Sequence, residues 1–302
     1  MKAKLFTVLL LWVTVQLQAQ DYVDVIRLSS NNAVRGNEEN DYKTMINNLN
    51  LQVYYPIRMS EKLVLLSGFT VENTRLNKFE GAERNNLLMT RLNLGIKYQF
   101  SDKWSGIFLA LPKIASDFVQ IDEQDLQMGG LGLMSYQLSE LWSVKFGLYV
   151  SSENHGSTIT PLLGVWYRSR NRKFYIDAVL PIRADINYSL TSSFSIGADL
   201  LTSVKSYSVW INNSDFYTQE ESIRVGAYVA YGFLKNTLLL RLRAGLDTTD
   251  YGLYQTGDRI GGQILTTPIN GDNRNRFNPA FESGFYFGGD LIYRFDLTKE
   301  KG

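Results

Sequence analysis

The chain has 302 residues, no cysteine, a formal net charge of +1 and a mean hydropathy of −0.16, although 44% of its residues are apolar. The near-neutral charge gives no reason to expect a nucleic-acid partner, and the lack of cysteine excludes disulfides and thiolate metal sites. Beyond the N-terminal region no apolar run has the length of a membrane-spanning helix. A membrane protein of this composition is therefore expected to be a β-barrel, in which half of each strand faces water.

The N-terminal stretch MKAKLFTVLLLWVTVQLQAQ has the three parts of a secretory signal peptide. Two lysines precede an apolar run from Leu5 to Val15, and small and polar residues follow around Ala19. The run is too short for a membrane anchor, which needs about 20 residues, and no cysteine follows it for lipid attachment. Residues 1–19 are predicted to be a signal peptide. Residues 20–302 are predicted to be one barrel domain, because no linker-like stretch divides them.

The segment RLNLGIKYQFSDKWSGIF, residues 91–108, shows the pattern that recurs along the chain. Leu92, Leu94 and Ile96 fall on one face of an extended strand, and Arg91, Asn93 and Lys97 fall on the other. A period of two excludes a helix. It leaves open whether the apolar face points into a soluble β-sandwich or out toward lipid.

The lengths of the connections favour the membrane barrel. Short polar turns are predicted at 59–62, 101–103, 139–141, 170–172, 191–193 and 234–236. Longer excursions are predicted between and around them, at 29–44, 74–87, 117–125, 153–158, 181–184, 208–221 and 248–282. Strict alternation of short and long connections is expected when periplasmic turns are short and extracellular loops are long. The predicted fold is an all-β, antiparallel, up-and-down transmembrane barrel of 12 to 14 strands, fourteen by direct count.

Aromatic residues beside the short turns give a second indication. Tyr98, Phe100 and Trp104 flank the turn at 101–103, and Tyr231 with Phe233 precedes the turn at 234–236. Most of these rings share the lipid-facing parity of their strands, as expected for an aromatic girdle at one membrane interface. A soluble sandwich explains neither the girdle nor the sorting of the loops. The apolar face is therefore predicted to meet lipid.

Three stretches carry a resemblance to a known family. They are the signal peptide, the hairpin GVWYRSRNRKFYIDAVLPIRADINYSL at 164–190 and the closing segment GGDLIYRFDL at 288–297. Together they resemble an uncharacterised family of Gram-negative outer-membrane β-barrel proteins. More loosely, they are similar to fatty-acid transporter-type and phenol-degradation-type barrels. The resemblance implies a barrel in the cell outer membrane and supplies no catalytic residues.

The opposite parity on each strand predicts the side chains that face the lumen. Basic residues exceed acidic ones among them, which predicts a pore that favours anionic or amphipathic carboxylate solutes. The alternative is that these charges pair with one another and fill the barrel. The charged lumen-lining residues are predicted to be Arg91, Lys97, Lys145, Arg168, Arg183, Arg224, Arg241, Arg243 and Arg294, with Glu72, Asp177, Asp199, Asp247 and Asp290.

The excursion at 248–282 is much longer than an ordinary connection and is rich in Gly, Asn and Pro. Loops of this length are usually functional or disordered. It either folds into the lumen as a constriction, with Arg259, Arg274 and Arg276 at the gate, or forms a surface loop. We favour the surface loop.

The only histidine, His155, lies in the stretch NHGST with Ser157 two residues later. Outer-membrane lipid acyl hydrolases use such a pair near the extracellular rim, with histidine as base and serine as nucleophile. This sequence lacks the downstream Asn or Glu that would orient the imidazole, because Ser169 stands near that position. A solvated loop histidine is the expected role, and no catalytic residue is predicted.

The sequence therefore predicts a passive channel or porin-like transporter for small anionic or hydrophobic solutes, without cofactor or metal, and not an enzyme. The alternatives are a non-conducting barrel that displays loops for adhesion or partner binding, and a lipid hydrolase using His155 and Ser157. The expected partners are outer-membrane lipid, lipopolysaccharide, an unidentified solute and the barrel-assembly machinery, with no nucleic acid.

Overall fold

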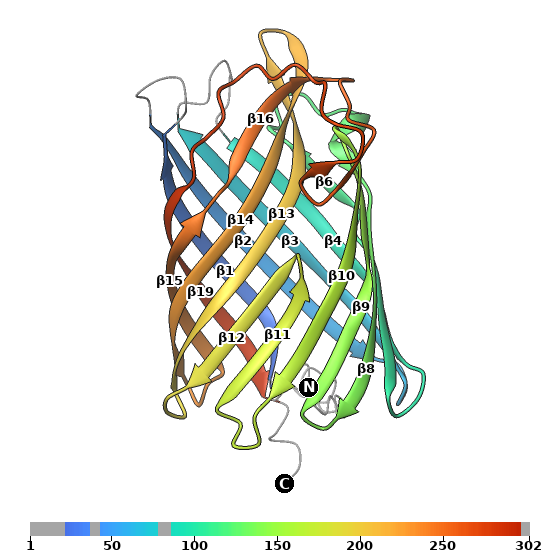
Figure 1. Cartoon of the computed structure of the whole chain (residues 1–302), viewed down its shortest axis with the longest axis vertical. Helices are drawn as coiled ribbons and strands as arrows, with labels where there is room; N and C mark the ends of the chain where they lie inside the picture. Colours follow the sequence, from blue (N-terminus) through green and yellow to red (C-terminus); the bar gives the residue numbers. More distant parts are fainter. Residues whose placement is uncertain (1–21, 37–42, 78–85, 297–302) are drawn as a thin grey trace, which may run out of the picture.

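The computed structural model describes residues 22–36, 43–77 and 86–296, so the predicted signal peptide lies outside the described residues. The described chain forms one antiparallel sheet that closes on itself as a barrel of fourteen strands (Figure 1). Closure is made by β1 and β19, which pair antiparallel with Leu28 opposite Leu291. Within the described ranges no helix is both long enough and apolar enough to cross a membrane.

The barrel strands differ widely in length, and additional short elements lie at the extracellular end. The barrel strands are β1 (Tyr22–Arg35), β2 (Thr44–Arg58), β3 (Leu63–Asn77), β4 (Asn86–Gln99), β5 (Trp104–Ala110), β8 (Gly129–Ser139), β9 (Trp142–Glu153), β10 (Gly156–Arg168), β11 (Phe174–Leu180), β12 (Arg183–Ser189), β13 (Phe194–Ile211), β14 (Ser214–Phe233), β15 (Leu238–Asp247) and β19 (Gly284–Asp296). The additional elements are β6 (Lys113–Ser116), the 3₁₀ turn η1 (Glu123–Asp125), β7 (Leu126–Gln127), β16 (Asp250–Gln255), β17 (Gly262–Ile264) and β18 (Thr267–Pro268).

The orientation of the strand faces is clear on β4. Leu92, Leu94 and Ile96 are 46%, 45% and 39% exposed, whereas Asn93 between them is 3% exposed. The apolar set therefore points outward and the polar set points into the barrel, as predicted for a membrane barrel. The same alternation continues on β9, β10 and β15.

The aromatic girdle is present at the end of the barrel with short turns. Tyr98 contacts Phe100 edge-on with ring centroids 5.0 Å apart, and Trp142 contacts Tyr167 at 4.3 Å. Tyr231 contacts Phe233 at 4.7 Å. Aromatic pairs of this geometry are typical of membrane interfaces, so this end, where β1 begins and β19 ends, is the periplasmic end (Figure 1).

Most of the predicted excursions were wrong in extent because they reach into strands, as three of them illustrate. The segment 208–221 is mostly strand, because β13 and β14 pair continuously to the turn at Asn212 and Asn213. Likewise 29–35 belongs to β1, and 153–158 contains only the two-residue turn Asn154–His155. Above the membrane the inward side chains become apolar and the outer ones polar, so the lipid-facing pattern that marks a strand in the sequence is reversed there.

Candidate functional site

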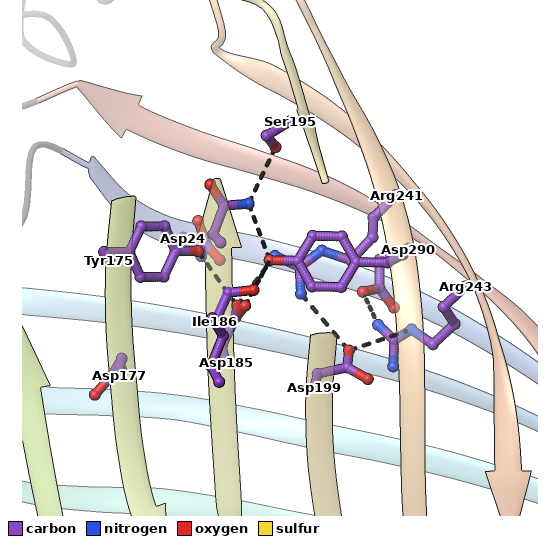
Figure 2. A network of polar contacts seen from close by, with 12 residues as sticks. Asp24, Tyr175, Asp177, Asp185, Ile186, Ser195, Asp199, Arg241, Arg243 and Asp290 are labelled. Carbon is purple, nitrogen blue, oxygen red and sulfur yellow. Dashed lines mark hydrogen bonds and ion pairs between the residues drawn. The ribbon is translucent and has the colours of Figure 1, made fainter. Parts of the chain in front are cut away.

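The periplasmic half of the lumen holds a network of ion pairs and hydrogen bonds centred on Asp185 of β12 (Figure 2). The Tyr228 hydroxyl donates to Asp185 at 2.6 Å, the Tyr175 hydroxyl donates at 3.3 Å, and the Arg241 guanidinium approaches it at 3.1 Å. The Arg241 guanidinium also lies 3.9 Å from the centroid of the Tyr228 ring. Asp185 is thus held by three side chains from three different strands.

The network continues along the inner face of the barrel wall to β19. Arg243 forms an ion pair with Asp290, and Asp199 lies 3.7 Å from Arg243 and 3.8 Å from Arg241. Arg243 and Asp290 are both buried. Two neighbouring arginines of β15 therefore bridge acidic residues of β12, β13 and β19, which ties four strands together in the interior.

A second charged group lies higher in the lumen. Lys205 of β13 forms an ion pair with Glu72 and lies 3.3 Å from Glu220. Glu220 accepts hydrogen bonds from Tyr207 at 3.4 Å and Tyr251 at 3.1 Å. These groups lie directly beneath the apolar residues that cross the extracellular end.

Two cavities occupy the lumen between these groups. The lower cavity, of about 530 Å³, reaches the periplasmic turns, since Arg172, Thr191 and Asn236 line it. The upper cavity, of about 630 Å³, is lined by basic and acidic side chains together with Asn48 and Asn50. Both cavities are lined by Asp24, Arg27 and Arg183, so they meet at these residues.

The extracellular end of the lumen holds an apolar layer. Its buried residues come from β1–β4, β6, β13, β16 and β19 and are Ala33, Ile46, Leu76, Leu87, Met89, Ala115, Tyr207, Val209, Ile211, Tyr251, Leu253 and Tyr286, with Phe216 and Phe281 packed against them. The wall itself bends inward here, because Ser116 of β6 pairs with Ser208 of β13 from across the barrel. Among the described residues, apolar side chains thus occupy the extracellular end of the lumen, while the lower cavity reaches the periplasmic turns.

The predicted lumen residues lie on the inward faces of their strands, and most have an ionic partner. Lys145 and Arg183 both contact Asp177, at 2.6 and 2.9 Å. Asp247 forms ion pairs with Arg35 and Arg224, at 2.8 and 3.6 Å. The cavity linings include Glu72, Arg91, Arg224 and Arg243 for the upper cavity and Arg168, Asp177, Arg241 and Arg294 for the lower one.

Arg91 differs from these paired cations. It lines the upper cavity from β4, and its Nε atom is buried without a hydrogen-bond partner. Among the described residues its guanidinium forms no hydrogen bond or ion pair. Its register partner on the neighbouring strand, Lys113, forms an ion pair with Glu153 at 2.6 Å.

Sequence reasoning missed several members of the network. Asp185 has the same inward parity as Arg183 on β12, so parity alone would have found it. Glu220 and Arg35 lie in segments that were predicted to be loops. Tyr228 was also missed, because a tyrosine on an inward face carries no charge that the sequence would reveal.

The long segment 248–282 lies on the extracellular rim. Its first part, β16, pairs with β14, and β17 pairs with the edge of β10 in parallel. Arg276 forms an ion pair with Asp250 at 2.6 Å, and Arg274 contacts Asp272 at 2.7 Å. Arg259 is exposed. The three arginines thus lie on the rim, whereas Tyr251, Leu253 and Leu265 of the same segment pack into the lumen, so neither the surface-loop nor the constriction interpretation describes the whole segment.

His155 is fully buried in the turn between β9 and β10, beneath the segment near Gly261. Its Nε2 atom lies 3.1 Å from Thr158 Oγ1, whereas the Ser157 side chain is exposed. Gly156 has φ +127°, and a Cβ atom there would lie 2.9 Å from the Gly261 carbonyl oxygen. The expectation of a solvated histidine was wrong, and the imidazole contacts Thr158 rather than the proposed nucleophile.

Burial lowers the pKa of His155 to about 4, against the opposing effect of the nearby Glu153 carboxylate. Arg274 and Lys113 also lower the pKa, and Asp272 acts in the raising direction. A histidine whose folded-state pKa is depressed stabilises the fold above its unfolded pKa of about 6.5. We expect the free energy of unfolding to fall by up to about 3 kcal/mol as the pH drops from about 6.5 to about 4.

The measurement is urea unfolding of the refolded protein in lipid vesicles at pH 7.5, 5.5 and 4. His155→Gln keeps a polar group beside Thr158 but cannot take up a proton in this range. The decrease in the free energy of unfolding between pH 7.5 and pH 4 should therefore be smaller in this variant by up to about 3 kcal/mol. Equal losses in both proteins would show that protonation of other groups is responsible.

The closed antiparallel barrel, the outward apolar faces, the aromatic girdle and the charged interior together define an outer-membrane β-barrel protein. Residues 16–254 match the family described as "Domain of unknown function (DUF6268)". The chain belongs to this family.

Solved outer-membrane proteins are similar to this chain in structure. The COG4313 outer membrane channel from Pseudomonas putida F1 is 11% identical, with 92% of this chain and 96% of that chain covered and a TM-score of 0.43. A deltaS2 mutant of the TodX monoaromatic hydrocarbon channel is 10% identical, with 90% and 88% covered and a TM-score of 0.37. The NanC porin is 9% identical, with 88% and 98% covered and a TM-score of 0.36. No curated protein matches the chain.

Proposed function

We propose that the protein is a passive outer-membrane channel for small anionic solutes, and in particular for carboxylates that carry an apolar part. The observation that carries this proposal is the Arg91 guanidinium, which lines the upper cavity without a partner among the described residues. A guanidinium removed from bulk water favours a carboxylate that can accept two parallel hydrogen bonds. The cavity thus presents a binding group for an anion rather than a completed ion pair.

The continuity of the interior supports passage rather than storage. The two cavities meet at Asp24, Arg27 and Arg183, and the lower one extends to the periplasmic turns. The ion pairs between them, such as Lys145–Asp177, leave space beside them instead of filling the barrel. A solute bound at Arg91 therefore has a polar path toward the periplasm.

The apolar layer favours a second candidate, a non-conducting barrel that displays its extracellular segments to a partner. Apolar side chains such as Tyr207, Ile211 and Leu253, buried in the extracellular end of the lumen, are what such a barrel requires. The two functions differ in whether an anion binds at Arg91 and whether current flows once the extracellular cover is removed.

Replacing Arg91 by Gln should weaken binding of decanoate about 10- to 100-fold, because a hydrogen-bonded charged group contributes about 1.5–3 kcal/mol. The measurement is calorimetric titration of the refolded protein with decanoate at low ionic strength. Binding of decanol, which has the same chain and no charge, should be unaffected. The free energy of unfolding should not fall, since Arg91 stabilises no described partner.

A matched control is Arg75→Gln, which removes the same charge from an exposed position on β3. It should leave decanoate affinity unchanged. Absence of decanoate binding in the unmodified protein, or equal affinity in the Arg91 and Arg75 variants, would contradict the proposed function.

A further inference from the structure

The barrel wall is interrupted above the hairpin of β11 and β12. These two strands have seven residues each, whereas the neighbours β10 and β13 have 13 and 18. The ladder between β10 and β11 ends at the pair Leu163–Leu180, and that between β12 and β13 ends at Arg183–Leu201. In the described chain, residues 159–162 of β10 and 203–207 of β13 have no strand partner on the edges that face each other.

This interruption is bounded on every side, and we call it the wall window. Its lower border is the hairpin tip, where Ile182 accepts a hydrogen bond from the Thr202 amide at 2.8 Å. Its upper border is the β9–β10 turn, where the Asn154 amide donates to Ser206 Oγ at 2.8 Å. Figure 1 shows the short β11–β12 hairpin between the taller β10 and β13.

The upper cavity extends into the wall window. Its lining includes Thr158 and Thr160 of β10, Ile182 of the hairpin tip, and the five consecutive residues 201–205 of β13. Only alternate residues of a strand inside a closed wall can face the lumen. Five consecutive lining residues therefore mean that the cavity reaches around the free edge of β13.

The wall window lies at the level of the lipid-facing surface. The outward side chains on its borders are apolar and exposed: Ile159 is 42% exposed, Leu163 70% and Leu180 47%. Ile223, opposite Thr202 on the next strand, is 36% exposed. Lipid does not tolerate unpaired strand edges unless they line a water-filled or occupied cavity. The Thr202 and Ser206 amides on this edge donate to Ile182 and Glu153, and the edge between them has to be covered by water or by a bound ligand.

The chemistry of the cavity changes between the wall window and its interior. Ile182, Leu201, Val204 and Leu265 line the side near the opening together with polar residues such as Thr160 and Ser203 and the cations Arg183 and Lys205, whereas Arg91 lines the interior. An amphiphile with one carboxylate and one apolar chain matches this order, with the chain toward the lipid and the carboxylate at Arg91. The apolar layer occupies the extracellular end above the cavity, and the wall window opens from the same cavity on the membrane side.

We propose that the wall window is a lateral portal, through which a single-chain carboxylic amphiphile moves between the membrane and the upper cavity. This inference rests on the proposed function and names its substrate class and route. β17 and β18 cover the upper part of the portal, because Gly262 and Gln263 pair with β10 and Leu265 lines the cavity. Both the hairpin tip and this cover thus set the size of the opening.

The chain contains no cysteine, so introduced thiols report on single positions. Ser203→Cys places a thiol at the free edge, and Ser222→Cys places one on its register partner, which lines the same cavity from the continuous wall at the same height. In vesicles that contain a phospholipid with a maleimide at the end of its acyl chain, we expect Ser203→Cys to be labelled at least ten times faster than Ser222→Cys. Leu163→Cys, on the outer face, is the positive control.

The functional test bridges the portal. In the double variant Thr160→Cys/Ser203→Cys, a bis-methanethiosulfonate reagent links the two edges and a reductant releases them. Linking should slow transfer of decanoate from vesicle lipid to the protein at least tenfold, and reduction should restore the rate. Each single-cysteine variant treated in the same way should keep the unmodified rate, and retained heat-modifiable migration in gels shows that the barrel stays folded.

The outcomes separate the two proposals. Decanoate that binds through Arg91 at a rate unaffected by the link, with Ser203→Cys unlabelled from lipid, would overturn the portal and leave the channel proposal intact. Decanoate that fails to bind any variant, linked or released, would overturn the channel proposal and the portal with it. Labelling of Ser203→Cys together with a reversible tenfold slowing supports both.

Discussion

Replacing residues 252–278 by a short Gly-Ser linker should turn a barrel that passes little current into one with at least tenfold larger conductance. The replacement removes Leu253 from the apolar layer and removes the Asn278 side chain, which accepts from the Leu253 amide at 2.7 Å and holds the rim segment in place. Water then reaches the remaining apolar side chains, and an apolar constriction that becomes wetted conducts ions. The open lumen should prefer anions, because Arg91 and Lys97 face it without acidic partners among the described residues.

The measurement is single-channel conductance in a planar bilayer with the reversal potential recorded in a salt gradient. A suitable control replaces residues 119–124 by a linker of the same kind, which alters another rim segment and leaves the apolar layer in place. Unchanged conductance in the 252–278 variant, from protein shown to be inserted, would favour the display function. Larger conductance in both variants would show that the rim as a whole, rather than this segment, closes the lumen.

Replacing Arg243 by Met should lower the free energy of unfolding by about 3–5 kcal/mol, the usual cost of leaving one member of a buried ion pair uncompensated. Asp290 is 1% exposed, and Arg243 is its only ionic partner among the described residues. Asp199 would lose one of its two neighbouring arginines as well. The measurement is the urea-unfolding free energy in lipid vesicles at neutral pH.

The double variant Arg243→Met/Asp290→Leu should recover most of this loss, because it removes both charges instead of isolating one. Arg27→Met is the comparison at an accessible site, since its ion pair with Asp24 leaves both side chains 30% exposed. Exposed pairs contribute about 0–1 kcal/mol. If Arg243→Met were no more destabilising than Arg27→Met, the interior around Asp290 would have to be hydrated enough to solvate the carboxylate.

Much of the fold followed from the sequence because lipid imposes one demand on every strand. Each wall strand must present apolar side chains at alternate positions, and Leu92, Leu94 and Ile96 show this directly. The six periplasmic turns were also predictable, because short polar turns must join strands whose lengths the membrane fixes. The extracellular extensions of β13 and β14 were not predictable, since Val209 and Ile211 point inward there and no lipid enforces the alternation.

The sequence predicts which residues of the candidate site lie in the interior, but not which of them contact one another. Strand parity placed Arg241, Arg243 and Asp290 in the interior, and the structure shows which of them pair. Strand parity could not indicate that Arg91 lacks a partner, because ion pairing depends on the relative heights of strands that are distant in sequence. The wall window was equally hidden, since the sequence around Pro181 reveals a turn but not how far the strands on either side continue above it.

The pairing of β1 with β19 has a consequence for how the protein is made. The first strand finds its last partner only after residues 284–296 have been delivered, so the barrel cannot close while the chain is still arriving. Contacts that join the two ends of a sequence form slowly, and both end strands offer unpaired edges to other chains until then. Loss of the last strand would therefore leave a sheet with two permanent free edges rather than a narrower barrel, and such a chain would aggregate before it reached the membrane.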